Sequence, residues 1–199
     1  RAANRLATAR RFGLPTHEPW LIAVAMMRDG DKLASYRILG GALDRLRQHP
    51  WRLLVVGDGT ARAAVERVFA PLGERVCYAG MLPPKDLPTV LGAADLFVWP
   101  AINEAYGMAI LEAQAAGLPV VAGRSGGVSD IVADAGTGLL VPPGDDAAFA
   151  EATRSLLCDD ERRATFSAAA LRKVKAEHDI TAAADALDQI VRLCVHGHA

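Results

Sequence analysis

The chain has few cysteines, almost no net charge and no long apolar run, and each of these absences excludes a class of protein. Its three cysteines are too few, and odd in number, for a disulfide framework, so cytosolic thiols are the simpler interpretation. A formal net charge of −1 supplies no positive field for a nucleic acid. No apolar run approaches the roughly 18 residues that a membrane-spanning helix needs, and we expect no signal peptide. We therefore expect a cytoplasmic protein with no nucleic-acid partner and no membrane span.

What the chain does contain is enough apolar sequence for one folded domain. Its 199 residues include 51% hydrophobic and 23% charged residues, which is typical of a globular domain with a proper core. Short apolar runs that read as buried strands alternate with helical segments, and lie near 21–27, 53–56, 76–79, 96–99, 118–122 and 139–141. This alternation predicts an α/β fold with a Rossmann-like, doubly wound parallel sheet and helices on both faces. An α-helical C-terminal tail follows, with helices expected near 147–157, 160–175 and 181–194.

The most informative stretch runs from Asn103 to Gly123. Between Met108 and Ala116 nearly every residue is apolar or small except Glu112, so we expect a helix buried on all sides that carries a buried carboxylate. A glycine at its first turn, Gly107, lies where unpaired N–H groups and the helix dipole favour an anion. Another carboxylate, Glu104, stands just ahead of the helix. Because parallel sheets bind ligands at the carboxyl ends of their strands, this arrangement indicates a ligand site.

This stretch also resembles a known signature. Glu104 and Glu112, separated by seven residues, with Gly107 between them and the run 117–121 after them, resemble the donor site of retaining glycosyltransferases of the large "group 1" family. The resemblance covers roughly 21–175. It implies one half of a GT-B fold, namely the C-terminal domain that binds a nucleotide-sugar donor and transfers a hexosyl group to an acceptor.

The resemblance implies a role for each residue of the signature. Glu112 would accept hydrogen bonds from the ribose hydroxyls, and Glu104 would face the donor sugar near its anomeric carbon. The backbone N–H groups of Gly107, Met108 and Ala109 would hold phosphate at the helix N-terminus.

Two cations, Arg28 and Lys32, fall in the loop after the first strand. They are either solvated surface charges or ligands of a diphosphate, and the Glu104–Glu112 unit on the same edge favours the second interpretation. The resemblance implies that this Arg and Lys stabilise the diphosphate leaving group. This loop differs from the common pattern of the family, because it is one residue shorter and has Leu33 where a glycine usually follows the Lys. With two cations present we expect no metal and no other cofactor.

Two further loops reach the same edge. Gly57 begins a Gly-Asp-Gly turn after the second strand, but the third glycine of a dinucleotide-binding fingerprint is missing because position 62 is Arg62. The turn would therefore be a tight strand-to-helix connection that borders the donor pocket. Met81 and Leu82, after the third strand, would cover the nucleobase, as the resemblance implies.

The resemblance also sets the expected domain organisation. We expect a single nucleotide-sugar-binding domain over 1–199, in which 1–19 is an interdomain linker or helix and 178–199 a C-terminal crossing helix. We expect the acceptor-binding N-terminal domain to lie outside this sequence, and a peripheral membrane association, if any, to arise through that domain. The isolated domain would then bind donor without transferring sugar, in an open half-cleft where Glu104 is solvated and the sugar adds little affinity.

Two alternatives remain open. The same pocket would serve a non-catalytic nucleotide-binding module, which the sequence does not exclude because the acceptor side is absent. A nicotinamide-dependent Rossmann oxidoreductase is less favoured, because the third glycine and an acid at the end of a second strand are absent.

Overall fold

The computed structural model describes residues 2–178, 184, 187–188 and 191–192. The strands are β1 (Trp20–Val24), β2 (Arg52–Val56), β3 (Val76–Gly80), β4 (Leu96–Trp99), β5 (Val120–Gly123) and β6 (Gly138–Val141). The helices are α1 (Ala2–Phe12), α2 (Asp31–Asp44), α3 (Arg62–Phe69), the 3₁₀ segment η1 (Ala70–Arg75), α4 (Leu87–Leu91), α5 (Met108–Ala115), α6 (Val128–Ile131), α7 (Asp146–Leu157) and α8 (Asp160–Glu177). None of the described helices is long and apolar enough to cross a membrane.

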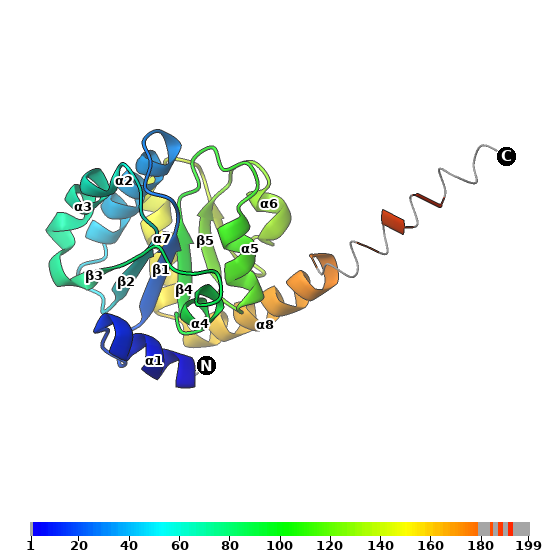
Figure 1. Cartoon of the computed structure of the whole chain (residues 1–199), viewed down its shortest axis with the longest axis horizontal. Helices are drawn as coiled ribbons and strands as arrows, with labels where there is room; N and C mark the ends of the chain where they lie inside the picture. The colour runs from blue at the N-terminus through cyan, green and yellow to red at the C-terminus, as the bar shows by residue number, and fades with distance from the viewer. Residues whose placement is uncertain (1, 179–183, 185–186, 189–190, 193–199) are drawn as a thin grey trace.

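The six strands form one parallel sheet in the order β3-β2-β1-β4-β5-β6 (Figure 1). Helices α2, α3 and α7 pack together on one face, and α4 and α5 cover the other with α1 and α8. Every residue of β4 and β5 is buried, as expected for parallel strands covered on both faces. The predicted Rossmann-like, doubly wound sheet and the helical C-terminal part are therefore confirmed.

The sheet has a switch point between β1 and β4. The chain moves outward from β1 to β2 and β3, then returns to the other side of β1, where Leu21 pairs with Leu96. The connections after β1 and β4 therefore leave in opposite directions. Such a divergence opens a crevice at the carboxyl edge, where ligands bind in folds of this kind.

Backbone pairing continues past the strand ends and holds this edge together. The expected first strand, 21–27, ends at Val24, but Ala25 N–H donates to Val56 C=O at 3.0 Å and Met27 N–H donates to Asp58 C=O at 2.9 Å. Gly57 allows this approach, because a Cβ atom there would lie 2.0 Å from the Ala25 carbonyl oxygen. The Gly-Asp-Gly sequence is thus a tight turn required by backbone packing.

Helix α1 is joined to the domain through Arg5. Its guanidinium donates to Asp95 Oδ2 at 2.8 Å and to the Ala93 carbonyl at 3.0 Å, and lies 4.0 Å from the centre of the Trp20 ring. Asp95 also accepts from the backbone N–H of Trp20 at 2.7 Å. The first part of the expected linker, 1–19, is therefore tied to the amino ends of β1 and β4. The expected helix at 181–194 lies almost wholly outside the described residues.

We expect Arg5→Met to lower the free energy of unfolding by about 3 kcal/mol, because it removes the guanidinium that pairs with the half-buried Asp95 carboxylate and with the Ala93 carbonyl. Arg11→Met is the matched control on the same helix. Arg11 also pairs with an aspartate, Asp86, but its side chain is 48% exposed against 19% for Arg5, so the loss should stay below about 1 kcal/mol. Urea denaturation measures both, and equal losses would contradict the anchoring role.

Candidate functional site

A cavity of about 520 Å³ opens at the carboxyl edge, beside the switch point. Nine of the ten residues singled out from the sequence line it, namely Lys32, Gly57, Met81, Leu82, Glu104, Gly107, Met108, Ala109 and Glu112. Arg28 does not line it and is exposed, and its side chain has no partner among the residues that the structure describes. Loops that follow four different strands thus converge on one concave site, as the topology predicts.

Glu104 and Lys32 form an ion pair in the wall of this cavity. Lys32 Nζ donates to Glu104 Oε2 at 2.5 Å, and the two side chains are only 16% and 18% exposed. The indole N–H of Trp99, the last residue of β4, donates to the same oxygen at 3.3 Å. The expectation of a solvated Glu104 is therefore wrong, because Lys32 and Trp99 both reach it from the walls.

The loop that carries Glu104 is held in an unusual backbone conformation. Ala101 and Asn103 have positive φ angles of 55° and 47°, which costs energy in residues with a side chain. Helix α2 holds this loop, because Ser35 Oγ accepts from the Ile102 N–H at 3.0 Å and Asp31 Oδ1 accepts from Asn103 Nδ2 at 3.1 Å. The same helix thus carries Lys32 and positions the loop that Lys32 contacts.

Helix α5 begins at the cavity with unpaired donors. Gly107 precedes it with φ 97° and ψ 48°, a left-handed conformation that suits glycine. Among the described residues, no acceptor pairs with the backbone N–H groups of Met108 or Ala109, which lie in its first turn. These donors, together with the helix dipole, provide a place for an anion.

The prediction that α5 is buried on all sides is wrong. Ile110, Ala113 and Gln114 are buried against the domain, whereas Met108 and Glu112, one turn apart, are exposed along the cavity side. The apolar composition suggested burial on every face, but one face of the helix lines the cavity and is not covered by other parts of the protein. The Glu112 carboxylate is therefore accessible and has no partner within the described part of the chain. Neighbouring protein still restricts its hydration, and this desolvation raises the pKa of Glu112.

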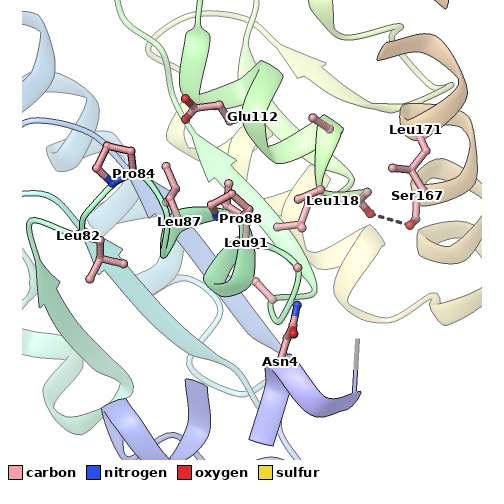
Figure 2. A pocket seen from close by; sticks show the side chains of 15 residues that line it. Asn4, Leu82, Pro84, Leu87, Pro88, Leu91, Glu112, Leu118, Ser167 and Leu171 are labelled. Carbon is pink, nitrogen blue, oxygen red and sulfur yellow. Dashed lines mark hydrogen bonds between the residues drawn. The ribbon is translucent and has the colours of Figure 1, made fainter. Parts of the chain in front are cut away.

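Glu112 also borders a second cavity, of about 610 Å³, that the sequence did not reveal (Figure 2). The two cavities share Leu82, Leu87 and Glu112 in their linings. Apolar side chains dominate the second one, among them Leu87, Pro88 and Leu91 of α4, and Asn4 of α1 and Ser167 of α8 lie at its far end. The Ser167 hydroxyl is engaged, since it donates to the Gly117 carbonyl at 2.6 Å.

Sequence reasoning also missed other residues of the first cavity. Trp99 could have been found, because it ends a buried strand at the carboxyl edge. Asp58 lines the cavity but serves the turn, accepting from Gly59 N–H and from Arg62, contacts that hold its pKa below the usual range. In the described part of the chain, no group of three or more His, Cys, Asp or Glu side chains is placed to hold a metal ion.

The fold and the cavity define a Rossmann-like α/β domain whose ligand site lies at the switch point of the sheet. The family model described as "Glycosyl transferases group 1" matches residues 18–159. The chain belongs to this family of glycosyltransferases. D-inositol 3-phosphate glycosyltransferase of Corynebacterium efficiens is 33% identical over 171 residues, which make up 82% of this chain and 40% of the relative.

Solved structures of glycosyltransferases have the same fold. Sucrose-phosphate synthase of Thermosynechococcus elongatus superimposes with a TM-score of 0.83 and 27% identity, over 96% of this chain and 49% of that one. HepE of Anabaena, solved with UDP-glucose, gives 0.81 and 22% identity over 96% and 53%. The C-terminal domain of the group 1 protein LpcC from Francisella tularensis gives 0.73 and 21% identity over 88% and 93%. The chain is thus one half of a GT-B fold, and it spans about half the length of the full enzymes or less.

We expect Gly126→Ala to lower the free energy of unfolding by about 3 kcal/mol or more, because a Cβ atom there would lie 2.1 Å from the Glu104 carbonyl oxygen. Gly13→Ala is the matched control. Gly13 also has a positive φ angle, but nothing lies within 4 Å of an added Cβ, so only the conformational cost of about 1 kcal/mol should appear. Urea unfolding of both variants checks this, and similar losses would show that the loop yields to the methyl group.

Proposed function

We propose that this chain is the donor-binding half of a retaining glycosyltransferase and that it binds a nucleotide sugar in the cavity at the carboxyl edge. The observation that carries the proposal is the convergence of Lys32, Glu104, Glu112 and the open N-terminus of α5 on one site. Family membership supports glycosyl transfer, and the likeness in fold to a protein solved with UDP-glucose supports a nucleotide-sugar ligand.

The chemistry of the lining residues assigns a part of the donor to each. The unpaired N–H groups of Met108 and Ala109 would hold phosphate, and Lys32 would stabilise the diphosphate as its charge grows on departure. Exposed Arg28 would reach the diphosphate from outside the cavity. Because these cations and N–H groups would stabilise the diphosphate, the proposal includes no metal and no further cofactor.

The remaining parts of the donor fit the rest of the cavity. Glu112, accessible and without a protein partner, would accept hydrogen bonds from the two ribose hydroxyls. Met81 and Leu82 would cover the nucleobase, beside the tight turn at Gly57. Glu104 would meet hydroxyls of the sugar near its anomeric carbon.

Transfer needs an acceptor hydroxyl beside the anomeric carbon, and its positioning can supply about 7–11 kcal/mol of barrier lowering. Within the proposal, the acceptor molecule supplies that hydroxyl and the N-terminal domain of a full enzyme holds it, so the present chain binds donor and does not transfer sugar alone. The cytoplasmic location inferred from the sequence remains a prediction.

A thermal-shift screen tests the proposal against its alternatives. UDP-, GDP- and ADP-sugars, the free diphosphates and NADH are compared at equal concentration. A matching nucleotide at about 100 times its Kd should add about 2.7 kcal/mol of stability and raise the Tm by roughly 5–10 °C, with NADH far weaker. A larger shift with NADH would favour the oxidoreductase. Sugar transfer by the chain alone would show that the acceptor site has been misplaced.

We expect Glu112→Gln to weaken binding of the best nucleotide by about 1–3 kcal/mol, the scale of a charge-assisted hydrogen bond, without changing the fold. Calorimetry measures the affinity. Glu151→Gln is the control, since it removes the same charge from an exposed pair with Arg154 on α7. Because the pKa of Glu112 is raised, wild-type affinity should fall on acidification from above the usual glutamate range. Equal affinity of parent and Glu112→Gln would end the ribose assignment.

A further inference from the structure

The ion pair between Lys32 and Glu104 neutralises the cation of the cavity before any ligand enters. The 2.5 Å contact joins two side chains that are mostly shielded from water, and Trp99 packs beside both. The Lys32 ammonium lies 5.6 Å from the centre of the Trp99 ring. In the described structure, therefore, the charge of Lys32 is committed to Glu104.

Glu112, in the same cavity, differs from Glu104 because no cation pairs with it in the described structure. Its carboxylate is exposed and has no partner among the described residues, so a ligand hydroxyl can approach it without displacing anything. Glu104 is different, because a ligand that draws Lys32 away removes the only cation that pairs with it in the described structure. A half-buried carboxylate without its cation is unfavourable.

A nucleoside diphosphate and a nucleotide sugar differ in what they offer Glu104. Both would bring negative phosphate oxygens to Lys32. The phosphate and the Glu104 carboxylate would then compete for the same ammonium group and repel each other, and water screens this repulsion poorly inside the cavity. The sugar of the donor also brings hydroxyl groups that can donate hydrogen bonds to Glu104 in place of the ammonium. The free diphosphate has no such group, so it leaves Glu104 poorly satisfied.

We propose that the Lys32–Glu104 ion pair makes this cavity discriminate against nucleoside diphosphate that lacks a sugar. The inference rests on the proposed function and adds to it a preference for the donor over the nucleotide product of its own reaction. Once the sugar leaves, Glu104 loses its hydroxyl donors and competes with the diphosphate for Lys32. The sugar then contributes to affinity, contrary to the expectation that assumed a solvated Glu104.

The test is Glu104→Gln in the full 199-residue chain, studied by calorimetry with UDP, GDP and ADP and their glucose or mannose conjugates. Glutamine keeps an oxygen that accepts from Trp99 and from a sugar hydroxyl, but it does not compete for Lys32 as an anion. We expect the free diphosphate to bind about fivefold more tightly or better, with no gain for the nucleotide sugar. Unchanged or weaker binding of the diphosphate would overturn the proposal.

Two controls separate the ion pair from a general effect of charge. Glu151→Gln removes the same charge from α7, outside the cavity, and should leave both affinities unchanged. In the background of Lys32→Gln, the gain from Glu104→Gln should disappear, because no cation remains to be freed. A gain that persists without Lys32, or that appears with Glu151→Gln, would also overturn the proposal.

The outcomes also distinguish this inference from the function on which it rests. If neither diphosphate nor nucleotide sugar binds the parent chain, both are wrong. If the parent binds them and Glu104→Gln keeps the parent's ratio of the two affinities, the proposed function stands and the discrimination fails. Unfolding temperatures of the variants show that each comparison is made on folded protein.

Discussion

The parallel pairing of β1 with β2 on one side and with β4 on the other is the constraint on which the site depends. Because the chain leaves β1 in one direction and β4 in the other, the two connections separate at the carboxyl edge. Lys32 follows β1, while Glu104 and Glu112 follow β4, so the charged groups on the two diverging connections face each other across the cavity. The strands themselves contribute mainly buried apolar side chains, so the sheet positions the site and the loops supply its chemistry.

Helix α2 couples the two sides of this divergence. It follows β1, yet its residues Asp31, Lys32 and Ser35 all contact the loop that follows β4. Ser35 is fully buried and uses its hydroxyl twice, donating to the Asp31 carbonyl and accepting from Ile102. These contacts offset the strain of the residues with positive φ beside Glu104. The position of Glu104 is therefore fixed by side chains far from it in sequence.

Much of this architecture was predictable, because it depends on local patterns. Apolar runs of strand length, separated by helices, gave the sheet, and nine of the ten singled-out residues line the cavity because their loops follow neighbouring strands. What could not be predicted depends on packing between distant segments. The sequence of α5 is apolar all round, and only the tertiary structure shows which face of it is left uncovered. Likewise, nothing in the sequence around Glu104 indicates that Lys32 and Trp99 would shield it.

At some positions in and behind the walls of the cavity, close backbone contacts restrict which residue can be present. At other positions the side chain can change without disturbing the fold. A methyl group at Gly57, in the wall, or at Gly126, which packs behind the loop of Glu104, would overlap a carbonyl oxygen of a neighbouring loop. By contrast, the cavity-lining methionines Met26, Met81 and Met108 are 57%, 76% and 56% exposed, and their side chains are little used in the core. Evolution can therefore exchange these three side chains at low cost to folding. The scaffold is in this sense evolvable, since the outline of the cavity can change while the loops that form it keep their places.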